Sequence, residues 1–210
     1  MIAIMNLLAR QPIESWILNN VPPQYHMPVL QTRNLLVRLL EPSEADKMVL
    51  FRKENQQHLE PWEPRRRPEF FTQNYWRLQL RAQQQEFKQG ASAALVVLNL
   101  ADTEVLGVCS FSNIVRGTFQ SCHLGYALGA RHQGQGIMAE ALKPACDYLF
   151  EQQLLHRIMA NYLPHNERSG RLLARLGFVI EGQAKQYLMI NGRWEDHVLT
   201  SLINPLHLTR

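Results

Sequence analysis

A glycine-containing segment, residues 128–137, is the part of this sequence best suited to bind an anion. It reads Leu-Gly-Ala-Arg-His-Gln-Gly-Gln-Gly-Ile. Gly134 and Gly136 remove side chains where a helix is expected to begin, and the first N–H groups of a helix have no partner within it. These amides and the helix dipole favour phosphate or pyrophosphate, and Arg131 adds a fixed positive charge. A turn that binds nothing also uses glycines, so the segment alone leaves both interpretations open.

Three familiar phosphate-binding patterns do not fit this segment. A Walker A loop requires Gly-Lys-Ser/Thr, which does not follow here. A dinucleotide-binding fingerprint requires a third glycine where Ala139 stands, and it opens after the first strand of a domain. A protein kinase would carry a lysine strand and a catalytic aspartate loop downstream, and the sequence has neither. If the segment binds phosphate, the ligand belongs to another class.

The elements that must position the segment alternate between strands and helices. In the first helix Ser43 is the expected N-cap, with Asp46 completing an imperfect capping box. The pair Asn191-Gly192 between strand-like runs is the strongest short hairpin signal. Hydrophobic periodicity predicts strands at 35–40, 93–100, 105–113, 124–128 and 156–162, and helices at 43–51, 72–88, 137–150 and 167–176. This order predicts a mixed α/β fold with helices on both faces of one sheet.

Composition and charge exclude several classes of protein. The 210 residues are 46% hydrophobic and 19% charged, which is enough apolar material for a core and excludes a disordered chain. No apolar run reaches the roughly 18–20 residues that cross a bilayer. Cys109, Cys122 and Cys146 lack Cys-x-x-Cys spacing, which argues against a disulfide framework or a metal site and favours the cytoplasm. The net charge of +4 favours an anionic partner.

The glycine segment resembles the acetyl-CoA pyrophosphate loop of the GCN5-related N-acetyltransferases. That family's pattern, Gln/Arg-x-x-Gly-x-Gly/Ala, is met by Arg131, Gly134 and Gly136. Asn166 follows a predicted strand and precedes a short helix, where the family uses an asparagine to bond the pantetheine arm. A finer resemblance to the Rim-type ribosomal-protein N-acetyltransferases is carried by 59–62, 111–117, 124–126 and 161–169. The resemblance covers about residues 32–205, which we take as the domain, with an extension at 1–31 and a tail at 206–210.

The resemblance implies a fold, a reaction and a set of binding residues. The fold is a mostly antiparallel sheet whose parallel middle strands splay apart, with helices on both faces. The reaction is direct transfer of acetyl from acetyl-CoA to the N-terminal amine, with alanine favoured, of a ribosomal protein. The implied cofactor-binding residues are Tyr126, Leu128, Arg131, Gly134, Gln135, Gly136 and Asn166, of which Tyr126 and Leu128 would act through the main chain.

The resemblance also implies a general acid but leaves the general base unassigned. Ser169 matches a family position near the departing thiolate, although a hydroxyl in a first helical turn often bonds only local backbone. Related proteins carry an acid on the strand after the Glu181-Gly182 pair, whereas residues 185–188 offer none. Glu181, His123 and Tyr187 are the remaining candidates for the base, each of which also has a purely structural interpretation.

The acceptor side is indicated by an aromatic residue followed by a basic run. Trp62 is expected to wall the acceptor pocket or to belong to the core. The run Arg65–Arg67 is either a solvated loop or a contact for ribosomal RNA. Two rival functions stay open. A polyamine or antibiotic acetyltransferase would need a carboxylate-lined pocket, against which the arginines count. A non-catalytic ribosome-maturation factor that keeps the fold is favoured only by the missing acid.

Overall fold

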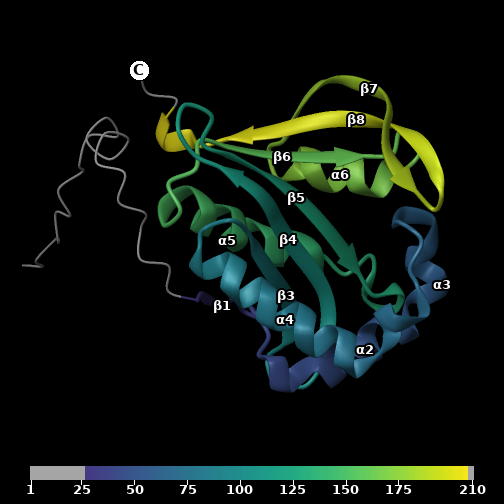
Figure 1. Ribbon diagram of the computed structural model, residues 1–210. Helices are drawn as coiled ribbons and strands as arrows, with labels where there is room; N and C mark the ends of the chain where they lie inside the picture. The colour runs from purple at the N-terminus through teal and green to yellow at the C-terminus, as the bar shows by residue number, and fades with distance from the viewer. Residues whose placement is uncertain (1–26, 208–210) are drawn as a thin grey trace, which may run out of the picture.

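The computed structural model describes residues 27–207, which form one eight-stranded sheet with helices against it (Figure 1). The strand order is β1-β2-β3-β4-β5-β6-β8-β7, and only the β5–β6 pair is parallel. The predicted, mostly antiparallel sheet is therefore confirmed. The strands are β1 (Val29–Gln31), β2 (Leu35–Arg38), β3 (Ala93–Asn99), β4 (Val105–Val115), β5 (Ser121–Leu128), β6 (Arg157–Tyr162), β7 (Val179–Ile190) and β8 (Arg193–Ile203).

Helices cover both faces of the sheet, as predicted. Helices α5 and α6 share one hydrophobic core with the sheet, and α2, α3 and α4 share a second one. The helices are α2 (Ala45–Glu54), α3 (Gln56–Leu59), α4 (Gln73–Lys88), α5 (Ile137–Glu151) and α6 (Glu167–Arg175), and the 3-10 turns are η1 (Pro42–Glu44), η2 (Glu60–Trp62), η3 (Pro68–Phe71), η4 (Ala130–His132) and η5 (Pro205–His207). Within residues 27–207, no helix is long and apolar enough to cross a membrane.

The parallel strands β5 and β6 separate soon after they meet. They pair only where Ser121–His123 faces Arg157–Met159. Beyond that point Leu124–Leu128 stays paired with β4, and Ala160–Tyr162 stays paired with β8. The two strands therefore diverge, and the edge of β5 that faced β6 no longer has a strand partner. The predicted splay is confirmed, and it opens a gap in the sheet next to the glycine segment.

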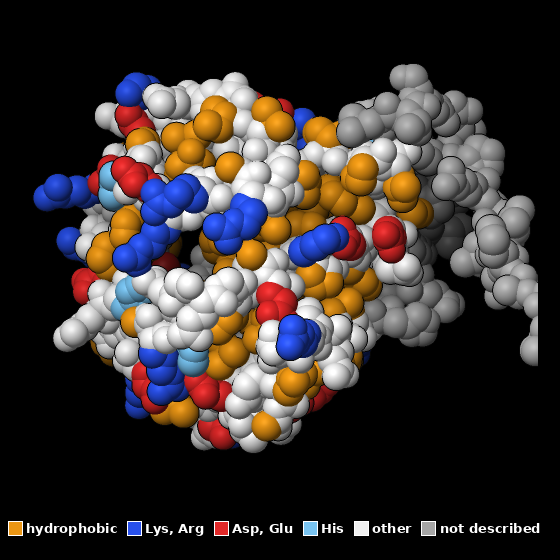
Figure 2. All heavy atoms as spheres, turned by 180° about the vertical axis from the view of Figure 1, so that it is seen from behind, with side chains coloured by type: hydrophobic (Ala, Val, Ile, Leu, Met, Phe, Trp, Pro, Cys, Tyr) orange, Lys and Arg blue, Asp and Glu red, His pale blue; other side chains and the backbone are white. Residues whose placement is uncertain are grey.

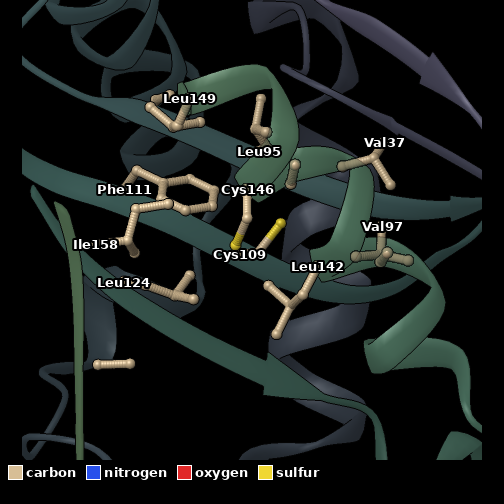
Figure 3. Packing of buried hydrophobic residues seen from close by; sticks show 14 of the residues in the cluster. Val37, Leu95, Val97, Cys109, Phe111, Leu124, Leu142, Cys146, Leu149 and Ile158 are labelled. Carbon is tan, nitrogen blue, oxygen red and sulfur yellow. The ribbon is translucent and has the colours of Figure 1, made fainter. Parts of the chain in front are cut away.

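The larger core lies between the sheet and α5 (Figure 3). Leu142, Cys146 and Leu149 on α5 meet side chains of the middle strands, including Cys109 and Phe111. This packing fixes where α5 begins, and with it the position of the glycine segment. All three cysteines are free and buried, and burial raises the pKa of the Cys109 thiol to about 12, so that thiol stays protonated.

The first predicted helix boundary is wrong, and the reason is local. Pro42–Glu44 forms a 3-10 turn ahead of α2, so Ser43 is not the N-cap and Asp46 completes no capping box with it. The Glu41 N–H donates to the Glu44 carboxylate at 2.8 Å, and Arg38 pairs with that carboxylate at 2.6 Å. The guanidinium holds the pKa of Glu44 at about 2. A capping pair between Glu41 and Glu44, held by Arg38 six residues before Glu44, has therefore replaced the predicted pair of Ser43 and Asp46.

Two further sequence predictions concern the start of the predicted domain and a turn near its end. Strand β1 lies before residue 32, in the part assigned to the extension, and it pairs with β2. The rest of that extension, residues 1–26, lies outside the described residues. Nearer the C-terminus, Asn191 and Gly192 have φ values of 44° and 82° and connect β7 to β8, so the predicted hairpin is confirmed.

Candidate functional site

The glycine segment forms a loop that leaves the backbone open at the start of α5. Gly134 and Gly136 have φ values of +74° and +78°, which favour glycine. A Cβ at either position would meet nothing within 4 Å, so open space lies over this backbone. The first helical hydrogen bond runs from the Glu140 N–H to the Gly136 carbonyl at 3.0 Å, and the amides of 137–139 precede it. The loop therefore has the geometry of an anion site.

Arg131 lies among acidic side chains. Its guanidinium pairs with Glu104 at 2.6 Å and lies 3.4 Å from Glu54, while the neighbouring His132 contacts the same Glu104. Gln135 donates from its side-chain amide to the Arg131 carbonyl at 2.9 Å. These contacts fix the shape of the loop. In this arrangement two carboxylates already oppose the Arg131 charge, so the backbone amides are better placed than Arg131 to bind an anion.

A pair of hydroxyls lies beside the splay. Tyr126 on β5 and Ser169 on α6 approach to 2.6 Å between their oxygens. Burial raises the pKa of Tyr126 to about 12, so the phenol keeps its proton at neutral pH. The side-chain oxygen of Asn166 accepts the Ser169 N–H at 3.2 Å and caps α6. Because Asn166 supplies the cap, the Ser169 hydroxyl is free to bond Tyr126, which argues against the purely local interpretation of that serine.

The three candidate bases have different surroundings. Glu181 is paired with Arg157 and accepts from Ser201 at 2.8 Å, and these partners lower the pKa of its carboxyl. Tyr187 accepts from the Asn161 side chain at 3.3 Å. His123 is the last β5 residue paired with β6. Its buried Nδ1 finds no hydrogen-bond partner within residues 27–207, and burial lowers the pKa of the ring.

Trp62 belongs to the surface of the molecule and not to the core. It is 37% exposed, and its ring centre lies 5.5 Å from that of His165, in the turn before α6. Sequence reasoning missed that the β7–β8 hairpin reaches the same region. The Asn191 N–H donates to the Glu63 carbonyl at 2.9 Å, and Arg65 Nε donates to Asn191 Oδ1 at 3.3 Å. No local signal marks this contact, because it joins residues 126 positions apart in the chain.

The predicted basic run is partly engaged within the molecule. Arg66 pairs with Glu63 at 3.2 Å and lies over the Phe70 ring at 4.5 Å. Glu63 also pairs with the buried Arg52 at 2.8 Å, beside a pocket of about 190 Å³. Arg67 is exposed. These contacts give Arg66 a structural role in shaping the segment that carries Trp62.

Positively charged side chains lie around a hollow on the face seen from behind in Figure 2, with apolar side chains between them. On α6, the side chain of Arg168 donates to the side-chain oxygen of Gln133 in the glycine segment. Arg171 pairs with Glu167 at 2.9 Å, and Arg175 is exposed. Arg168 therefore contacts the glycine segment, whereas Arg171 pairs within α6. In the described part of the chain, no group of three His, Cys, Asp or Glu side chains could hold a metal ion.

Comparisons with known proteins agree with this geometry. Residues 34–179 match the acetyltransferase (GNAT) domain family. The chain is similar to the [ribosomal protein uS5]-alanine N-acetyltransferase of Escherichia coli (strain K12), with 46% identity over 176 residues that cover 84% of this chain and 91% of that protein.

Two solved structures have the same fold over most of their length. The ribosomal-protein-S5-alanine acetyltransferase from Vibrio fischeri superposes with a TM-score of 0.82 and 43% identity, over 85% of this chain and 97% of that one. RimJ of Mycobacterium smegmatis, solved in complex with CoA-disulfide, gives a TM-score of 0.81 and 28% identity, over 90% of this chain and 93% of that one. The family match, the splayed sheet and the open amides before α5 lead to one conclusion: this chain belongs to the GNAT family and is an N-acetyltransferase.

Proposed function

We propose that this protein transfers acetyl from acetyl-CoA to the N-terminal amine of a ribosomal protein, with the N-terminal alanine of uS5 as the favoured acceptor. The observation that carries the proposal is the 46% identity to the Escherichia coli uS5-alanine N-acetyltransferase across nearly the whole length of both proteins. The solved relative that binds a CoA-disulfide supports the choice of cofactor. The geometry of the two sides of the site supports each half of the reaction.

On the cofactor side, the open backbone of Gly134 and Gly136 fits a pyrophosphate, because a side chain at either position would fill that space. Gln135 and Arg131 shape the loop around it. The unpaired edge of β5, from Tyr126 to Leu128, offers main-chain groups to the pantetheine arm and to the acetyl carbonyl. Asn166 uses its oxygen as the α6 cap and keeps its amide N–H₂ for the same arm.

The transfer itself places modest demands on acid–base groups. A C–N bond forms, the C–S bond breaks, and a proton moves from the amine to the thiolate. A protein α-amino group has a pKa of about 7.7–8.0, so a useful fraction is already neutral near pH 7. The neutral ring of His123, at the start of the splay, is our candidate to accept the proton. Ser169, held by Tyr126, donates a hydrogen bond to the departing sulfur.

On the acceptor side, Trp62 packs near His165 before α6, and the tip of the β7–β8 hairpin contacts the segment that follows Trp62. We propose that they hold the first residues of the acceptor chain. Contact between Arg65–Arg67 and ribosomal RNA stays a prediction, for which Arg67 is the exposed cation. The cytoplasm is the expected location, which the three free, buried cysteines support. We keep 32–205 as the catalytic domain, with β1 of the extension packed on its sheet.

The test is to incubate the purified protein with labelled acetyl-CoA and a mixture of ribosomal proteins, and to locate the label by mass spectrometry. We expect label on one N-terminal amine, that of uS5. Parallel reactions with a polyamine and with a peptide bearing only a lysine amine control for the acceptor. Label on the polyamine alone would support a small-molecule enzyme, and CoA binding without any transfer would support a non-catalytic ribosome factor. Either result would overturn the proposal.

A further inference from the structure

A buried asparagine joins the glycine loop to the junction between helices α2 and α3. Asn55, 7% exposed, lies between α2 and α3. Its side-chain oxygen accepts the Ala130 N–H at 2.8 Å, and its side-chain amide donates to the Phe51 carbonyl at 2.8 Å. Both ends of the side chain are therefore engaged, one on the loop and one on α2. A buried polar group satisfied in this way specifies one arrangement, because losing a partner leaves the other buried and unpaired.

Two neighbours of Asn55 reach the same loop. Glu54 lies 3.4 Å from Arg131, and His58 Nε2 lies 2.8 Å from the side-chain nitrogen of Gln133. The junction between α2 and α3 thus contacts the loop at three positions just before Gly134. Of these three contacts, only that of Asn55 reaches the loop backbone, so Asn55 is the residue that fixes the path of the main chain.

The same asparagine also begins the helix that leads to the acceptor side. The Asn55 carbonyl accepts the Leu59 N–H at 2.9 Å, which closes the single turn of α3. Helix α3 continues directly into η2, which ends at Trp62. The side chain of Asn55 therefore bonds the glycine loop, while its main-chain carbonyl bonds the first turn of the segment that leads to Trp62.

We propose that Asn55 is a positioning residue that holds the pyrophosphate loop in register with the acceptor segment. This inference rests on the proposed function, since it assigns CoA to the loop. The bond to Ala130 fixes the start of the loop, whose later amides must point at one ligand. Without that bond the loop would have to become ordered on binding, and the entropy cost of this ordering would weaken the affinity for CoA. Substituting Asn55 therefore weakens CoA binding and raises KM for acetyl-CoA more than it lowers kcat.

Two variants remove the bond from opposite sides. Asn55→Ala removes the acceptor, and Ala130→Pro removes the donor without touching α2. Proline suits position 130, because it is the first residue of the 3-10 turn η4 and because Gly129 has φ −58° and ψ 143°, which precede proline readily. Asn55→Asp keeps the oxygen that accepts the Ala130 N–H but loses the amide that donates to the Phe51 carbonyl, so it separates the bond to the loop from the bond to α2. Thr72→Ala removes the cap of α4, which lies away from the loop, and controls for general loss of stability.

The experiment is calorimetry with CoA on the wild type and the four variants, together with thermal melts and steady-state kinetics. We expect the Kd for CoA to rise about tenfold in Asn55→Ala and Ala130→Pro, as for loss of one buried hydrogen bond, and to rise less in Asn55→Asp. Thr72→Ala should melt earlier and bind CoA within twofold of the wild type.

Three outcomes would contradict this assignment or its basis. If Asn55→Ala and Ala130→Pro both bind CoA within twofold of the wild type, Asn55 does not position the loop. If Thr72→Ala weakens CoA binding as much as they do, the effect is one of stability, and the proposal is equally overturned. Should Asn55→Ala fail to fold, Ala130→Pro decides alone. A wild-type protein that binds no CoA would instead overturn the proposed function, and this inference with it.

Discussion

The loop proposed to bind the cofactor and the surface proposed to bind the acceptor are built in opposite ways. Residues 129–137 are contiguous, and their proposed binding groups are main-chain amides left open by two glycines with positive φ. The proposed acceptor side combines a tryptophan from η2, a histidine from the turn before α6 and the tip of the β7–β8 hairpin, and its contacts join distant segments through side chains and one main-chain bond. The first region is a property of local backbone geometry. The second exists only after distant segments have met.

This difference has a consequence for how each region tolerates change. An amide-based site depends on backbone conformation, so most side chains around it can vary while the two glycines cannot. In a site built from side chains of several segments, each substitution should lower the affinity only slightly, because each contact contributes little to binding. The three predictions that follow test this contrast, from the largest expected effect to the smallest.

Single substitutions in the glycine loop should have the largest effect, on CoA affinity. Gly134→Val and Gly136→Val each force a branched residue into positive φ and fill the space over the amides, so we expect CoA affinity to fall at least ~100-fold. Calorimetry measures the affinity. Gly117→Val is the matched control, because Gly117 also has positive φ, at +69°, with nothing near its Cβ position, and it lies in the β4–β5 turn. Unchanged CoA affinity in the folded loop variants would contradict the proposal that this loop binds the CoA pyrophosphate.

Ser169 tests whether side chains matter next to the cofactor loop. Ser169→Ala should lower kcat and kcat/KM together by about 100-fold, because a hydrogen bond to the departing thiolate matters mainly in the transition state. The cap of α6 stays in place, since Asn166 accepts a main-chain N–H there, so the melting temperature should change little. Steady-state kinetics and a thermal melt on one preparation check both. A normal kcat would end the catalytic role of Ser169.

A single substitution on the acceptor side should have the smallest effect, on KM for the acceptor. Asn191→Gly keeps a turn residue suited to φ 44° and removes only the side-chain oxygen that accepts from Arg65. We expect KM for an N-terminal acceptor peptide to rise about 3–5-fold, the effect of one exposed hydrogen bond, while the Kd for CoA stays constant. Peptide kinetics at saturating acetyl-CoA measure the change. An unaltered peptide KM would show that the hairpin tip takes no part in acceptor binding and would break the contrast between the two regions.

The sequence predicted most of the framework because the signals for it are local. The apolar stripe of α5, the paired glycines and the Asn191-Gly192 turn each act within a few residues of themselves. The start of the first helix was predicted wrongly, because Arg38 recruits Glu44 and sets the turn ahead of α2. The local reading of Ser169 was equally incomplete, since its hydroxyl partner, Tyr126, lies 43 positions away on another element.

The sequence by itself determined the order of strands and helices, the place where an anion could bind and the family to which the chain belongs. The tertiary structure decided the rest: the point where β5 and β6 part, the pairing of Tyr126 with Ser169, and the contact between the hairpin tip and the segment at Arg65. It also brought the side chain of Asn55 to the main chain of Ala130. The physical reason is that backbone preferences act between neighbours in the chain, whereas hydrogen bonds between side chains depend on which distant segments the packed core brings together.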